Sequence, residues 1–207
     1  RAVIRPAPKT SFKDRLVQVA MSPESGQEAA KLGAQMMAFN YKPMEVQKQE
    51  FDLYKEAFVS HHGHQPKPLL LTDMTVCDTD AARAEENSKY IASYLVSVLH
   101  HYDLMGEHYK NAKGYEAYGE AVDAMREVGK EGMMQAYLDQ QIWGTPDKIL
   151  RQFEERRKLM GTTGALLCFR FAGMPFEASL RSQSLFAKEV MPVLKSWEDE
   201  DASEKAA

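Results

Sequence analysis

Two serines at the start of a helical pattern have the chemistry to bind an anion. Ser22 and Ser25 lie in the segment from Leu16 to Gly33, LVQVAMSPESGQEAAKLG, where a short apolar run meets Ser-Pro-Glu-Ser and then the apolar spacing of a helix. Hydroxyl groups beside the free N–H groups of a first helical turn suit a phosphate. Ser22 followed by Pro23 is also a common way to cap and begin a helix, and this needs no ligand. The local pattern leaves both interpretations open.

Further polar and aromatic residues come at the ends of other apolar runs. Phe39 and Asn40 end one run, and Arg170 and Phe171 end another. If these runs are parallel strands of a barrel, their carboxyl ends meet at one rim, where barrel active sites gather. We therefore expect these four residues to face one cavity at this rim. Ordinary structural roles remain open: Phe39 as core, Asn40 as a turn former and Arg170 as a surface or ion-paired residue.

Three histidines invite a metal-binding interpretation, because imidazole is a common ligand. His61, His62 and His64 lie in the polar loop HHGHQPKP, with no carboxylate or cysteine at a matching spacing. A solvated loop is the favoured interpretation, and we predict no metal site.

The candidate residues must be positioned by alternating strands and helices. Apolar runs of strand length occur at Leu16–Ala20, Ala34–Phe39, Leu69–Cys77 and Ala165–Phe171. Between and after them lie six helical patterns. The first two run over Pro23–Leu32 and Pro43–His61, and the third follows a cap at Asp78 or Thr79. The fourth covers about Ala121–Leu138, with Gly129 and Gly132 weakening its middle; the fifth runs from Thr145 to a stop at Gly161, and the sixth lies beyond Phe176. Such alternation predicts an α/β fold with parallel strands joined by crossover helices.

Composition excludes several classes of protein. The 207 residues are 44% hydrophobic and 27% charged, with a net charge of -4, and lack the basic stripe that nucleic-acid binding requires. No apolar run is long enough for a membrane span or a signal peptide. Cys77 and Cys168 lie in separate apolar runs and fit reduced thiols, so we expect a cytoplasmic protein without nucleic-acid or membrane partners.

The chain resembles the bacterial luciferase-like flavin-dependent monooxygenase superfamily. The resemblance is carried by the anion pocket, by the helix start GTPDKI and by the terminal segment FRFAGMPFEASLRSQSLFAKEVMP, all in the family's order. It implies a partial (β/α)8 barrel, in which the four apolar runs are approximately strands five to eight with their helices. Residues 1–197 would form this C-terminal half of the barrel, and residues 198–207 a disordered polar tail.

The resemblance also implies a cofactor and a reaction. Reduced FMN would act as a co-substrate with dioxygen, and a small organic molecule would be oxidised. The cofactor-binding residues carried over are Met21, through its backbone, Ser22 and Ser25, with Glu24 adjacent; Glu24 is expected to point away from the phosphate or to serve the first helical turn. Phe39 and Asn40 would wall the flavin ring, and Arg170 or Phe171 would face the same cavity, so these four residues are the substrate-binding candidates.

Two alternatives stay open beside the monooxygenase. One is a deazaflavin-dependent oxidoreductase on the same barrel, which transfers hydride without oxygen. The other is a non-catalytic half-barrel subunit. The family's first four strands are absent from the sequence and usually carry the polar groups nearest the chemistry, so we expect the catalytic residues to lie outside these 207 residues. The resemblance further implies a flavin reductase as a partner and a homo-oligomer when the protein is full length.

Overall fold

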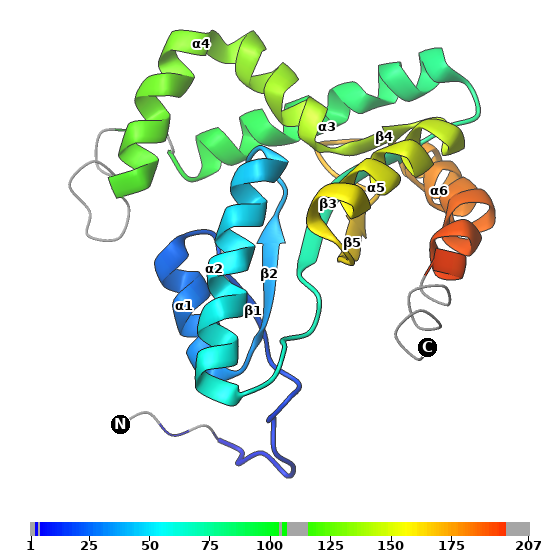
Figure 1. Ribbon diagram of the computed structural model, residues 1–207. Helices are drawn as coiled ribbons and strands as arrows, with labels where there is room; N and C mark the ends of the chain where they lie inside the picture. The colour runs from blue at the N-terminus through cyan, green and yellow to red at the C-terminus, as the bar shows by residue number, and fades with distance from the viewer. Residues whose placement is uncertain (1–2, 4, 104, 107–115, 198–207) are drawn as a thin grey trace. The chain divides into compact units, whose positions relative to one another are not determined.

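The computed structural model describes residues 3, 5–103, 105–106 and 116–197 of the chain, with side chains in helix α4 from residue 127 onward. Strands and helices alternate along it (Figure 1), in the order β1 (Val17–Val19), α1 (Pro23–Leu32), β2 (Gln35–Phe39), α2 (Met44–His62), β3 (Leu70–Cys77), α3 (Ala81–His101), α4 (Glu116–Gln140), β4 (Ile142–Gly144), α5 (Pro146–Met160), β5 (Gly164–Cys168), α6 (Phe176–Leu185) and the π-helical segment η2 (Phe186–Val190). Its contacts divide it into a first unit (Arg1–Phe39, Pro43–Thr72 and Leu159–Leu166) and a second unit (Asn40–Lys42, Asp73–Lys158 and Leu167–Ala207).

The first unit is a parallel sheet with helices on one face. β1 pairs with β2 in the register Val17↔Gln35, and β2 pairs with the start of β3 in the register Met37↔Leu70. At the start of β5, the Gly164 amide donates to the Leu69 carbonyl at 2.9 Å. Helices α1 and α2 lie side by side against β1 and β2 (Figure 1). The buried side chains between these layers are Ala20, Ala29, Ala30, Met36, Ala38, Phe51, Tyr54, Phe58, Leu69, Leu71 and Met160.

The other face of β1 and β2 is apolar and open in this unit. Side chains alternate across a strand, so Met36 and Ala38 pack towards the helices while Phe39 points the other way. Val17 and Val19 on β1 are 49% and 47% exposed, and Phe39 is 38% exposed. This face therefore presents apolar side chains beside the start of α1.

The second unit is built around the end of β3. Thr75, Val76 and Cys77 pair in parallel with Ile142, Trp143 and Gly144 of β4. Two buried clusters surround this pair: one contains Met74, Val76, Ile91, Phe171, Met174 and Ala178, and the other contains Cys77, Ile142, Ile149, Phe153, Phe186 and Val190. Leu194 and Trp197 pack against the second cluster from the helical residues 191–197, which follow η2.

The predicted α/β class with parallel strands is confirmed, and most elements lie within a few residues of their predicted bounds. The interior of α4 is interrupted at Gly129, where φ is 76° and ψ is 168°, as the glycine pattern predicted. The predicted cap of α3 is wrong: Asp80 is the N-cap, and its carboxylate accepts hydrogen bonds from the Ala82 and Arg83 amides. Strand β4 was not predicted.

Two further expectations concern the ends and the surface of the chain. The polar tail 198–207 lies outside the described residues. Among the helices of the described residues, none combines the length and the apolar character that crossing a membrane requires.

Candidate functional site

Ser22 and Ser25 form a reciprocal cap at the start of α1. The Ser25 amide donates to Ser22 Oγ at 3.3 Å, and the Ser22 amide donates to Ser25 Oγ at 3.0 Å. Ser25 Oγ also accepts from the Met21 amide at 3.1 Å and donates to the Ser22 carbonyl at 2.9 Å. The two hydroxyl groups are 3.2 Å apart. The capping role is therefore fully realised, and the amides of Met21, Ser22 and Ser25 and the Ser25 hydroxyl all donate within the cap.

Glu24 occupies the first turn of α1 and keeps a carboxylate near the helix start. A hydrogen bond from its own amide and a second from the Ser22 hydroxyl lower the pKa of this carboxyl, and its slight desolvation opposes them weakly. Of the two expectations for Glu24, the first-turn role is the one that the structure has. The side chain is exposed, so its carboxylate can leave the helix start without disturbing packing.

Met21 and Phe39 connect the start of α1 to the end of β2. The Phe39 amide donates to Met21 Sδ at 3.3 Å, and the Phe39 carbonyl accepts from Gln47 Nε2 at 3.1 Å. Gln47 is buried, so α2 fixes the backbone at the point where β2 ends. The first unit thus brings Met21, Ser22, Ser25 and the partly exposed ring of Phe39 together.

Asn40 lies in a buried polar network of the second unit. Its Nδ2 donates to Asp73 Oδ1 at 2.8 Å and also to the Gln140 carbonyl. Asp73 receives two further hydrogen bonds from Arg156, from Nη1 to Oδ2 and from Nη2 to Oδ1, both at 2.8 Å. Asp73 is 0% exposed, Arg156 5% and Asn40 1%. Asn40, which was predicted to contact the substrate, is therefore a buried residue whose side chain is hydrogen-bonded to the carboxylate of an ion pair.

Gln141 completes this network at the start of β4. Its Oε1 accepts from the Met74 amide at 2.8 Å, and its Nε2 donates to the Asn40 carbonyl. Gln152 Nε2 in turn donates to the Gln141 carbonyl at 3.1 Å. Among the described residues, Asn40 Oδ1 is one of the buried side-chain oxygens without a hydrogen-bond partner. The network therefore has one remaining acceptor position.

Asp73, Arg156 and Gln141 were not among the predicted site residues. The signal for Asp73 is present in the sequence, because a carboxylate within the apolar run LLLTDMTVC must find a partner when it is buried. No comparable signal marks Arg156, which shares α5 with Arg151, Arg157 and Lys158.

Arg170 and Phe171 follow β5 and differ in their surroundings. Arg170 is exposed, and its guanidinium lies 5.4 Å from the centre of the Phe176 ring. Phe171 is 8% exposed and packs edge-on against Tyr94, with ring centroids 6.3 Å apart. Arg170 is thus free to meet a ligand from solvent, whereas Phe171 supports the core beneath it.

Two of the histidines of α2 and the following loop lie within hydrogen-bond distance of backbone carbonyl groups. His62 Nε2 lies 2.8 Å from the Ala30 carbonyl, and His64 Nδ1 lies 2.9 Å from the Gln65 carbonyl. Within the described part of the chain, no group of three or more His, Cys, Asp or Glu side chains is placed to hold a metal ion.

Comparison with solved structures shows a shared fold. A monooxygenase from Streptomyces bottropensis, RslO1, is 20% identical with a TM-score of 0.58, covering 86% of this chain and 47% of its own. The oxygenating constituent of 3,6-diketocamphane monooxygenase from Pseudomonas putida, solved with FMN, is 17% identical with a TM-score of 0.59, covering 85% and 47%. A coenzyme F420 dependent tetrahydromethanopterin reductase from Methanopyrus kandleri is 18% identical with a TM-score of 0.54, covering 85% and 50%.

These alignments cover most of this chain but only about half of each solved chain, as expected for part of a (β/α)8 barrel. A search among curated proteins found no match. The model of the family described as luciferase-like monooxygenase matches residues 1–163, a range that includes the start of α1 and ends just before β5. The chain therefore belongs to the luciferase-like monooxygenase family.

Proposed function

We propose that this chain is part of a flavin-dependent monooxygenase that uses reduced FMN and dioxygen to oxidise a small organic substrate. The observation that carries the proposal is the family match over residues 1–163, which spans the serine cap of α1. The FMN complex of the Pseudomonas putida enzyme, whose fold is similar, supports FMN as the cofactor. A separate flavin reductase would supply the reduced cofactor, and the whole protein would form a homo-oligomer.

The start of α1 fits the phosphate of FMN in the kind of donors it offers. The hydroxyl groups of Ser22 and Ser25 and the amides of the first turn would hold the phosphate oxygens in exchange for the bonds that they now make within the cap, with the Met21 backbone beside them. The Glu24 carboxylate now accepts a hydrogen bond from the Ser22 hydroxyl, so the Glu24 side chain must rotate away from the helix start before a phosphate can bind. Because like charges repel, Glu24 should weaken FMN binding and favour a partly protonated phosphate.

When bound, reduced FMN supplies the electrons with which dioxygen is cleaved, one oxygen atom entering the substrate and the other leaving as water. The residues of this chain would bind the cofactor and the substrate and shield them from water. Phe39 would offer an apolar surface beside Met21, and Arg170 would meet a polar group of the substrate. Asn40 and Phe171 would keep the ends of β2 and β5 in position, since both are buried.

A titration that compares FMN with riboflavin tests the phosphate site, because riboflavin lacks only the phosphate. We expect FMN to bind about tenfold more tightly, since charge-assisted hydrogen bonds each contribute about 1.5 to 3 kcal/mol. The double variant Ser22→Ala/Ser25→Ala should lose this preference, whereas Ser97→Ala, an exposed serine on α3, should keep it. Equal affinity for both flavins, or an unchanged preference in the double variant, would rule out this site.

A deazaflavin-dependent oxidoreductase is the second candidate, supported by the fold shared with the Methanopyrus kandleri reductase. Such an enzyme transfers hydride and consumes no oxygen. Oxygen uptake that depends on the organic substrate and exceeds the autoxidation of free reduced FMN, measured with an oxygen electrode, supports the monooxygenase. Substrate oxidation without oxygen uptake supports the deazaflavin enzyme. A protein without affinity for either cofactor would instead be a non-catalytic half-barrel subunit.

A further inference from the structure

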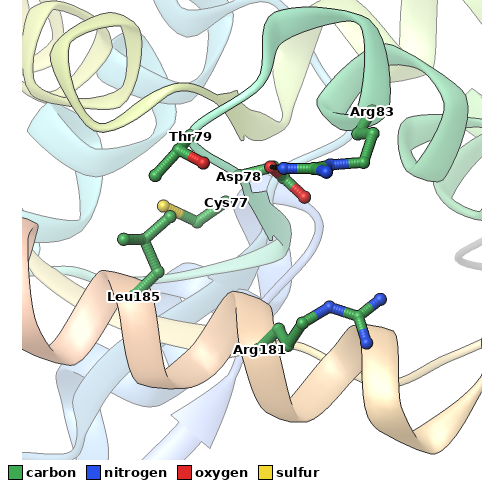
Figure 2. A pocket seen from close by; sticks show the side chains of 6 residues that line it. All are labelled: Cys77, Asp78, Thr79, Arg83, Arg181 and Leu185. Atoms are coloured by element: carbon green, nitrogen blue, oxygen red, sulfur yellow. Dashed lines mark hydrogen bonds and ion pairs between the residues drawn. The ribbon is translucent and has the colours of Figure 1, made fainter.

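A pocket of about 320 Å³ opens at the carboxyl end of β3, within the second unit. We call it the arginine pocket; its lining residues are Cys77, Asp78, Thr79, Arg83, Arg181 and Leu185. Cys77 is the last residue of β3, Asp78 and Thr79 form the turn into α3, and Arg181 and Leu185 come from α6 (Figure 2). Its volume is at the lower end of the range for small-molecule sites.

The walls of the arginine pocket are held together by buried contacts. The Cys77 amide donates to Ser182 Oγ at 2.7 Å, and this bond ties the end of β3 to α6. Ser182 is 2% exposed and adjoins Arg181 in sequence. The pocket is therefore formed before any ligand arrives, which lowers the entropic cost of binding.

The acidic groups around the pocket are each engaged by a neighbour on their own segment of the chain. Asp78 Oδ1 accepts from Arg83 Nε at 3.2 Å and from Arg83 Nη2 at 3.0 Å. The Asp80 carboxylate caps the amino end of α3, and Glu189 lies 3.9 Å from Lys188. Asp78 and Glu189 are therefore paired with cations other than Arg181, and the Asp80 carboxylate is satisfied by backbone amides.

Arg181 is the remaining cation of the pocket. Among the described residues it forms no hydrogen bond or ion pair, and it acts on Asp78 only through its charge. Its guanidinium stands apart from the Asp78–Arg83 pair in Figure 2, while the Leu185 side chain and the Cys77 thiol lie together on the other side of the pocket. The pocket thus combines a planar, unpaired cation with an apolar wall.

We infer that the arginine pocket binds a small organic monocarboxylate, whose carboxylate pairs with Arg181 and whose apolar stem contacts Leu185 and Cys77. A guanidinium matches a carboxylate through two parallel N–H···O bonds, and one unpaired cation balances one negative charge. The Thr79 hydroxyl offers a further donor at the edge of the pocket. This site shares no residue with the serine cap of α1, and the inference does not depend on the flavin proposal.

Titration of the isotope-labelled protein with hexanoate, followed through backbone amide chemical shifts, tests the inference. We expect hexanoate to shift the Cys77, Thr79 and Ser182 amides, and hexanamide, its neutral isostere, to bind about tenfold more weakly. Arg181→Gln should weaken hexanoate binding by about tenfold as well, and Arg181→Lys, which keeps the charge but loses the fork, should bind more weakly than the wild type but more tightly than Arg181→Gln. Arg151→Gln, an exposed arginine on α5, is the matched control and should bind like the wild type.

Three results would overturn the inference. Hexanamide binding as tightly as hexanoate would show that only the apolar wall matters. Inorganic phosphate binding as tightly as hexanoate would show simple attraction of anions. Unchanged binding by Arg181→Gln would remove the assigned residue. Arg181 is exposed, makes no hydrogen bond within the described residues and acts on Asp78 only through its charge, so this variant should unfold close to the wild-type temperature.

Discussion

The ion pair between Asp73 and Arg156 provides the sharpest test of how the second unit is stabilised. Both carboxylate oxygens of Asp73 are hydrogen-bonded to the guanidinium at 2.8 Å, and the two side chains are 0% and 5% exposed. Arg156→Leu keeps a side chain of moderate size and removes the charge. It leaves Asp73 with the amide of Asn40 as its remaining side-chain partner in the network.

The size of the effect follows from burial. An unpaired buried carboxylate typically costs about 3 to 5 kcal/mol of folding free energy. The double variant Asp73→Leu/Arg156→Leu removes both charges, and replacement of a buried pair by apolar residues is often neutral. Asn40 then loses one acceptor but keeps the Gln140 carbonyl, a loss of about 1 kcal/mol. The double variant should therefore be more stable than the single variant by about 2 to 4 kcal/mol.

Urea unfolding followed by tryptophan fluorescence measures this difference. Trp143 and Trp197 both belong to the unit that contains Asp73 and Arg156, so their emission reports on that unit. With an m value of about 1 to 3 kcal/mol per M, Arg156→Leu should lower the urea midpoint by about 1 to 5 M. A loss below about 1 kcal/mol in Arg156→Leu, or a double variant no more stable than the single one, would refute the assigned role of the ion pair.

Three other predictions follow from single residues. Gly33 ends α1 with φ 69°, and an added Cβ would lie 3.3 Å from the His62 ring, so Gly33→Ala should lower the free energy of unfolding by about 1 to 2 kcal/mol in thermal unfolding. Gly63→Ala, at φ 73° with open space around it, should cost only the backbone strain of the positive φ. An equal cost for both variants would contradict the His62 contact. Burial raises the pKa of Asp78, but the Asp80 amide, Arg83 and Arg181 outweigh it and hold this pKa below the ordinary 3.8. The resulting stability is present above the unfolded-state pKa and is lost as the pH falls through the folded-state pKa, so the difference in unfolding free energy between wild type and Asp78→Asn should shrink as the solution is acidified; a difference that does not change with pH would argue against it. Burial, with the charges of Asp78 and Glu189, raises the pKa of the Cys77 thiol to about 12, so a thiol-reactive dye at pH 8 should label Cys168 readily and Cys77 only after unfolding; rapid labelling of both would be the contrary result.

Local signals predicted the helices of this chain better than its short strands. Helix α1 has the predicted bounds because Ser22 and Gly33 determine both of its ends through their own backbone and side-chain chemistry. Strand β4 is only three residues long, Ile-Trp-Gly, and such a segment is too short to show alternation. The cap of α3 was missed because Asp78, Thr79 and Asp80 offer three adjacent side-chain oxygens, and Arg83 engages Asp78.

The residues of the candidate site likewise divide into those that a local sequence motif reveals and those that only the folded structure brings together. The serine cap is a local motif, so the sequence was sufficient to find Ser22 and Ser25. The network around Asn40 depends on Asp73 and Arg156, which are 83 residues apart. Periodicity places Arg156 on a helix but does not single it out from the other basic residues of α5. Long-range pairing of this kind needs the folded structure.

The π-helical segment Phe186–Val190 determines which side of the following helix, residues 191–197, faces the core. A helix advances by about 100° per residue, so loss of one residue here would turn the remaining helix by that angle without changing its hydropathy. Leu194 and Trp197 now face the cluster that includes Phe186 and Val190; after such a deletion they would face solvent. Relatives that are one residue shorter or longer within Phe186–Val190 should therefore have the apolar residues of the following helix shifted by one position in sequence. In an alignment, the gap should lie inside this π-helical segment.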